Sequence, residues 1–186
     1  MIRLGVALAV ATAVLAGCGS GEKPAGSAGG KEVRATGGDY VYTVPPGFVE
    51  EPVRGKLASQ PESHTTAVGL KGDAKSGVVV HEVPDPTGAR SVDELAAFVA
   101  PRFRDVDGKV PDPTHGRMAG RPALRFQLKG RSVRNGDRLD GEAWFVLAPR
   151  GQLTVVSCQW PPNRRDTVAR GCAWVVKTLR VSERRG

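Results

Sequence analysis

Two cysteines near the carboxyl end of the chain, Cys158 and Cys172, constrain its fold more than any other feature. Residues 152–160 alternate in the manner of a β-strand, and Cys158 shares one face of that strand with Val156. Residues 165–180 carry apolar side chains at helical spacing, and Cys172 lies on this apolar stripe. A helix packed on that strand face would bring the two sulfur atoms together.

The amino-terminal residues have the architecture of a secretory signal. Arg3 precedes an uncharged apolar run over residues 4–15, which is too short to cross a bilayer because crossing takes about 20 apolar residues. The run ends in Leu-Ala-Gly-Cys at 15–18, which resembles the lipobox of bacterial lipoproteins. The resemblance implies that residues 1–17 are removed and that the Cys18 sulfur receives a lipid. The alternative is an ordinary cleaved signal with an incidental cysteine.

Export sets the expected chemistry of the other cysteines. With Cys18 lipidated, Cys158 and Cys172 remain as a pair in an oxidising compartment, where we expect a disulfide. It would contribute roughly 3 kcal/mol in the loop-entropy account. We expect no metal site, because no histidine or carboxylate stands at ligand spacing near either cysteine in the sequence, and we expect no cofactor.

The composition divides the chain into three parts. After the signal peptide at 1–17, residues 19–38 are rich in Gly, Ser, Ala and Lys, so 18–38 is predicted to be a lipidated cysteine followed by a flexible tether. Residues 39–186 are predicted to form a single α+β domain. The expected location is the outer face of the cytoplasmic membrane.

The first half of this domain predicts strands and one helix. Alternating β-branched and aromatic residues favour strands at 40–44, 65–71 and 77–83, the last two joined by a hairpin loop. Ser91 and Glu94 have the spacing of a capping box, which predicts a helix over 92–103. Pro101 should kink that helix or end it early.

The second half predicts a three-stranded antiparallel meander and a second helix. Leu124, Phe126 and Leu128 alternate with polar residues, and further strands are predicted at 141–148 and 152–160. The helix over 165–180 follows. The predicted fold class is therefore α+β, an antiparallel sheet flanked by two main helices.

Charge provides the one candidate binding surface. The formal net charge of +8 favours anionic surfaces, but nucleic acid is not an expected partner of an exported protein. Alternation places Arg125, Lys129 and Arg131 on one strand face, opposite Phe126. This basic face would suit an envelope protein or an anionic envelope polymer, and its alternative is a solvated charged surface. The membrane is the other expected partner, through the lipid anchor.

Catalytic motifs are absent from the sequence, and no catalytic residue is assigned. His81-Glu82 lacks the second histidine of H-E-x-x-H, and the sequence contains neither a G-x-S-x-G elbow nor a P-loop. Trp144, Trp160 and Trp174 are interpreted as core or sheet-end residues.

Two functions remain: a non-catalytic binding or accessory role in the envelope, or an envelope hydrolase whose site is assembled from distant residues. A pocket that holds His81 or His115 against a carboxylate and a hydroxyl would favour the hydrolase.

The order of these elements resembles a known family. The segment Tyr-x-Tyr-x-Val-Pro-Pro-Gly-Phe at 40–48, a capped central helix, a meander and a cysteine-bearing final helix are similar to the PsbP-like, LpqN/LpqT-type lipoproteins over 39–181. The resemblance implies a sandwich in which an antiparallel sheet is flanked by helices. It also implies binding or accessory roles and supplies no catalytic residues to carry over.

Overall fold

Two antiparallel sheets and two α-helices make up the part of the chain that the computed structural model describes, residues 30–53, 64–102, 111–132 and 138–182. The large sheet has seven strands in the order β3-β4-β5-β9-β8-β7-β6. Its strands are β3 (Phe48–Glu51), β4 (His64–Leu70), β5 (Gly77–Pro84), β6 (Thr114–Met118), β7 (Arg121–Ser132), β8 (Arg138–Ala148) and β9 (Gln152–Trp160).

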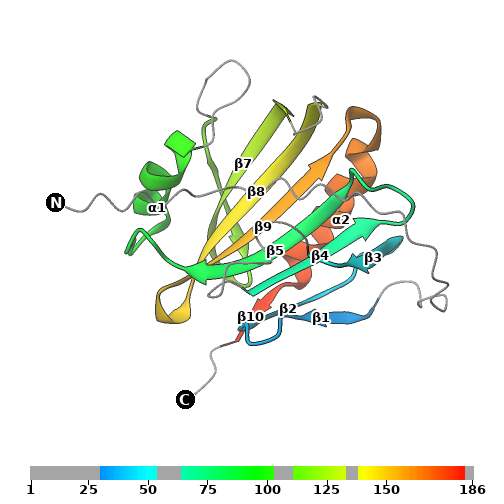
Figure 1. Ribbon diagram of the computed structural model, residues 1–186. Coiled ribbons are helices and arrows are strands. Elements are labelled where there is room, and N and C mark those ends of the chain that lie inside the picture. The colour runs from blue at the N-terminus through cyan, green and yellow to red at the C-terminus, as the bar shows by residue number, and fades with distance from the viewer. Residues whose placement is uncertain (1–29, 54–63, 103–110, 133–137, 183–186) are drawn as a thin grey trace.

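The small sheet lies beneath the large one in Figure 1 and has the order β1-β2-β10. Its strands are β1 (Glu32–Arg34), β2 (Tyr40–Thr43) and β10 (Arg180–Val181). Tyr40 ties the two sheets together, since its hydroxyl lies 2.9 Å from the carbonyl oxygen of Val80 and 3.1 Å from Thr66 Oγ1. Burial raises the pKa of this phenol above its ordinary value, so Tyr40 stays neutral and bonded.

The first helix begins and ends as its sequence signals predict. Helix α1 (Val92–Val99) is capped by the Ser91 hydroxyl, which accepts from the Glu94 amide at 3.2 Å. The Glu94 carboxylate accepts from the Arg90 amide, one residue before the expected position. Pro101 lies in a 3₁₀ turn, Ala100–Arg102, that ends the helix early because proline cannot donate to the preceding turn.

Helix α2 (Arg165–Thr178) follows β9 and carries the second cysteine. Gly171 faces the ring of Phe48 so closely that a Cβ there would collide with it, and the glycine therefore lets the helix pack on β3. Within the described ranges, no helix combines the length and the apolar character needed to span a membrane.

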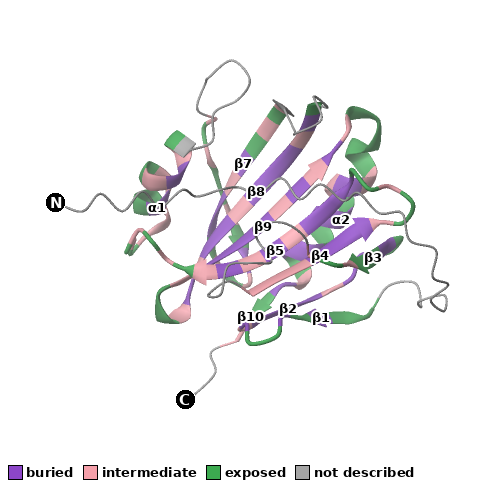
Figure 2. Cartoon of the chain, viewed as in Figure 1, coloured by how far each residue is buried: buried purple, intermediate pink, exposed green. Residues whose placement is uncertain are grey.

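The two helices belong to two apolar cores on the large sheet (Figures 1 and 2). In the first core, Leu95 and Val99 of α1 pack with Leu124, Phe126 and Phe145. In the second, α2 and the small sheet pack on the other set of alternating strand positions, which includes Val78, Val80, Val146, Val156 and Cys158. Cys172 belongs to the same core from the side of α2. Both faces of the meander are therefore buried over much of their length, which gives the sheet apolar contacts on each side.

Most of the predicted elements are present. The β4–β5 hairpin, the β7-β8-β9 meander and both helices are confirmed within one to a few residues of their expected bounds. Two expectations are corrected. The strand at 40–43 belongs to the separate small sheet, and β1 lies inside the segment expected to be a tether. Val33 is buried in the α2 core and β1 pairs with β2, so Glu32–Arg34 belongs to the folded domain. Cys18 and the signal segment lie outside the described residues.

Candidate functional site

Cys158 of β9 and Cys172 of α2 form the predicted disulfide, with their Cα atoms 6.0 Å apart. Both side chains are buried in the core beneath α2. As expected from the alternation of β9, Cys158 shares its sheet face with Val156, and the helix covers that face. The bond fastens α2 directly to the middle of the large sheet.

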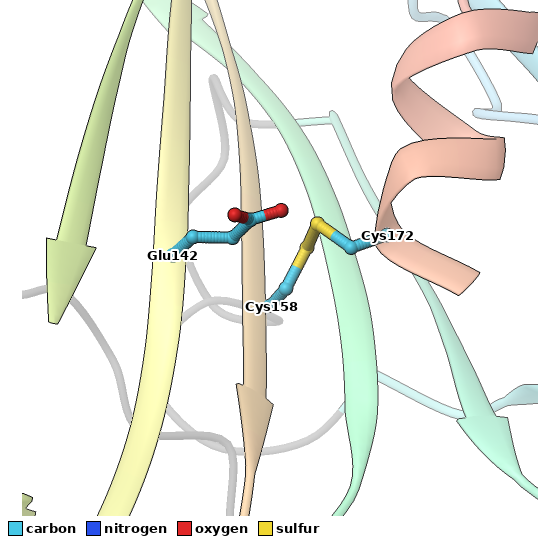
Figure 3. A group of neighbouring side chains, drawn as sticks. All are labelled: Glu142, Cys158 and Cys172. Atoms are coloured by element: carbon cyan, nitrogen blue, oxygen red, sulfur yellow. A yellow bond between two sulfur atoms is a disulfide. The ribbon is translucent and has the colours of Figure 1, made fainter. Parts of the chain in front are cut away.

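A buried carboxylate lies beside this disulfide. Glu142 is the register partner of Cys158, and its side chain is only 5% exposed. In Figure 3 its carboxylate extends from β8 toward the two sulfur atoms that join β9 to α2. A Glu142 oxygen and the two sulfurs all lie within 4.8 Å of one another. No carboxylate stands at ligand spacing near the cysteines in the sequence, but the pairing of β8 with β9 brings Glu142 beside them in the structure.

Glu142 is held by three N–H donors from two residues. The Arg125 Nε–H donates to Glu142 Oε2 at 2.8 Å, and the Nη2 group of the same guanidinium donates to that oxygen as well. The Trp144 indole N–H donates to Glu142 Oε1 at 3.2 Å. Both carboxylate oxygens are thus bonded, which offsets the cost of removing a charge from water.

The guanidinium of Arg125 is also fixed by an aromatic ring. Its central carbon lies 5.4 Å from the centroid of the Trp144 ring, and the two residues are register partners on β7 and β8. Gly116 of β6 completes this packing, since a Cβ there would lie 2.8 Å from the Trp144 ring. We call Arg125, Glu142, Trp144 and the Cys158–Cys172 disulfide the arginine–glutamate cluster.

The cluster has the chemistry of a fixed hydrogen-bond donor. A guanidinium carries five N–H donors, and the bonds to Glu142 use those of Nε and Nη2. The Arg125 side chain is 36% exposed, so its outer edge reaches solvent while its inner edge is anchored. Such a fork suits a carboxylate or phosphate group. With both sulfurs joined in the disulfide, the trio of Glu142, Cys158 and Cys172 offers no thiolate to a metal ion.

The predicted basic surface is not brought together as expected. Arg125 lies on the α2 face of the sheet and is paired with Glu142, whereas Lys129 is exposed further along β7. The register shifts between Leu128 and Arg131, with Gly130 at φ 55° and its N–H bonded to Asp140 Oδ1 at 2.8 Å. Such a bulge adds one residue to β7 and so breaks the alternation of its two faces. Arg131 is the register partner of Leu139, and the alternation no longer assigns Arg131 to the strand face of Arg125.

The histidines occupy three separate positions. His115 Nε2 lies 2.9 Å from Asp93 Oδ1, with both side chains largely exposed to solvent. His81 is the register partner of Thr65 and Val155, and burial lowers its pKa to about 4. His64 is the register partner of Glu82, whose carboxylate accepts from the Asp39 amide at 2.9 Å. The described contacts do not combine His81 or His115 with both a carboxylate and a hydroxyl.

Sequence reasoning missed Glu142, the contact of Trp144 with it, and the position of Trp174. The signal for Glu142 was available, since it is the one charged residue in the otherwise apolar stretch 141–148. Trp174 was expected in the core or at a sheet end, but it is 38% exposed on α2.

Comparison of the fold with solved structures identifies similar proteins. The solution structure of cyanobacterial PsbP (CyanoP) from Synechocystis sp. PCC 6803 matches with a TM-score of 0.58 and 17% identity, over 88% of this chain and 98% of that one. A crystal structure from Bacteroides thetaiotaomicron VPI-5482 matches with a TM-score of 0.54 and 11% identity, over 83% of this chain and 49% of that one.

The crystal structure of LpqN, involved in cell envelope biogenesis of Mycobacterium tuberculosis, matches with a TM-score of 0.47 and 11% identity, over 82% of this chain and 91% of that one. No family model matches the sequence, and no curated protein matches it either. The chain thus has a PsbP-like fold, as the sequence resemblance predicted.

Proposed function

We propose that this chain is a lipid-anchored protein on the outer face of the cytoplasmic membrane, and that it binds a partner in the cell envelope without catalysing a reaction. The anchor is supported by the apolar signal segment and the tetrapeptide that ends in Cys18. The buried disulfide supports export, because such bonds persist in oxidising compartments.

The observation that carries the binding role is the fixed guanidinium of Arg125. Glu142 and Trp144 hold it in one orientation, so little side-chain entropy is lost when a ligand accepts from its outer edge. The ligand class is an acidic group, a carboxylate or phosphate, presented by an envelope protein or an anionic envelope polymer.

The same cluster argues for binding over catalysis. Both oxygens of Glu142 accept hydrogen bonds, and both cysteines are joined in the disulfide. A general base or nucleophile needs a lone pair aimed at the substrate, and these bonds occupy the groups that would supply one.

The test is in-cell crosslinking followed by affinity capture of the tagged mature protein. Arg125→Gln combined with Glu142→Gln removes the fork without leaving a buried charge unpaired, and Arg90→Gln removes one exposed charge elsewhere as the matched control. We expect a reproducible protein or phosphate-rich polymer that the control retains and the double variant loses. Capture of no partner, together with turnover of an ester or glycan by the purified protein, would overturn the proposal in favour of the hydrolase.

A further inference from the structure

The outward side of α2 carries an exposed tryptophan between two cations. Trp174 is 38% exposed, and Arg170 and Lys177 lie four residues before it and three residues after it. These spacings place the three side chains on one face of the helix, opposite the buried residues Val168, Cys172 and Val175. Asp166 is the acidic residue on this face, one turn from Arg170.

This part of α2 lies next to the strand where the described chain begins. The Thr178 hydroxyl donates to the carbonyl oxygen of Trp174 at 2.9 Å and accepts from the Thr43 amide at 3.2 Å. Thr43 of β2 is the register partner of Glu32 of β1, and Glu32 in turn forms an ion pair with Arg180, just beyond the helix. The last turn of α2 therefore contacts β2, and β1, which begins at Glu32, is the next strand.

The position of Cys18 connects this geometry to a membrane. Gly30, the first described residue, comes twelve positions after Cys18, and even a fully extended chain over that span reaches only about 40 Å. A lipid on Cys18 would thus hold the β1 end of the domain, and the α2 end beside it, close to the bilayer.

We propose that Arg170, Trp174 and Lys177 form a docking face for anionic phospholipid head groups, which orients the anchored domain on the membrane. Tryptophan is suited to the head-group region because its ring is amphipathic, and the two cations complement the negative surface potential. The inference deepens the proposed function and rests on its anchor for the geometry, but the contact itself is a separate property of α2.

The experiment reads tryptophan fluorescence in the full mature protein, purified from membranes, with its mass measured to establish lipidation. The protein is reconstituted in vesicles whose acyl chains are brominated, made of phosphatidylcholine alone or with phosphatidylglycerol. Bromine quenches a tryptophan that enters the interface, and Trp144 and Trp160 are the other two tryptophans. We expect stronger quenching with phosphatidylglycerol, weakening at high salt, and its loss in Trp174→Phe.

Charge variants complete the test. Arg170→Gln with Lys177→Gln should lower the docked-to-undocked ratio about fivefold per charge. Arg90→Gln with Lys129→Gln removes the same charge at other exposed sites and should leave the ratio unchanged. Equal quenching in the two lipids, or quenching that survives Trp174→Phe, would overturn the docking face. If quenching does not depend on the lipid and Trp174→Ala changes the oligomeric state, the docking face is overturned, and the face would instead bind a second copy of the chain. If the mature protein carries no lipid, the anchor of the proposed function is refuted. The docking face is still tested in that case, because the unlipidated protein can be added to the same vesicles and its quenching measured.

Discussion

At the scale of single residues, Glu142 is a buried charge whose stability depends on its neighbours. Its carboxylate is buried beside a disulfide and depends on Arg125 and Trp144 for hydrogen bonds. Glu142→Ala leaves the guanidinium and the indole N–H without their acceptor, so we expect a loss of about 3 kcal/mol in the free energy of unfolding. This is the lower end for a broken buried pair, because the outer edge of Arg125 reaches water. Urea denaturation measures the loss.

A double variant distinguishes the effect of the Arg125–Glu142 ion pair from the effect of side-chain packing. Arg125→Met with Glu142→Leu replaces both charges by apolar side chains and should recover most of the lost stability. A double variant as unstable as Glu142→Ala would show that the charges themselves are required.

His81 makes the stability depend on pH. Burial lowers its pKa from 6.5 to about 4 in the folded protein, so between these values the unfolded chain binds a proton that the folded chain does not. Its contribution is therefore fully present above pH 6.5 and is lost as the pH falls toward 4. We expect His81→Gln to reduce the acid-side loss by about 3 kcal/mol, measured by urea denaturation across this range. His115→Gln, at an exposed histidine, is the matched control, and an equal effect from both variants would contradict the account.

The face of β7 that carries Arg125 could not be predicted from the sequence. Alternation correctly buries Leu124 and Phe126, but it assigns Arg125 to solvent because it assumes one buried face. The other face is covered by α2 and the small sheet, and nothing in the local pattern of β7 reports a second layer. The bulge at Gly130 likewise depends on pairing with β8, so parity could not carry the prediction on to Arg131.

At the scale of elements, the disulfide fixes α2 to β9. Its loop separation of 14 residues corresponds to roughly 3 kcal/mol in the loop-entropy account. We expect Cys158→Ala with Cys172→Ala to lower the free energy of unfolding by about that amount while circular dichroism still reports the helix, since the apolar stripe of α2 remains. The same loss on reduction of the wild-type protein is the control. A double variant that is as stable as the oxidised protein would contradict this role.

Elements with strong local signals could be predicted, and those defined by their partners could not. The cap at Ser91 and the proline at Pro101 bound α1, and alternation locates the meander strands. The short strands β1, β3, β6 and β10 went unpredicted, because two to five residues carry too little pattern. β1 was hidden in a glycine-rich segment, where Val33 was its one bulky apolar residue.

At the scale of the whole molecule, the arginine–glutamate cluster and the exposed face of α2 occupy different parts of the fold. The arginine–glutamate cluster lies on the large sheet, while the last turn of α2 contacts β2, one strand away from β1, where the described chain begins. An anchor on that side would leave the α1 end directed away from the membrane (Figure 1). The PsbP-like fold class could be predicted from the order of elements, but the split into two sheets required the structure.

The most direct test of the central claim is the intact mass of the mature protein, combined with membrane fractionation of wild type and Cys18→Ala. The account predicts a wild-type protein that begins at Cys18, carries a diacylglyceryl group and fractionates with membranes, because lipid chains supply the affinity. Cys18→Ala should accumulate as precursor or in the soluble fraction. A wild-type protein that is processed without lipid, or a Cys18→Ala variant that is processed and still fractionates with membranes, would contradict the account.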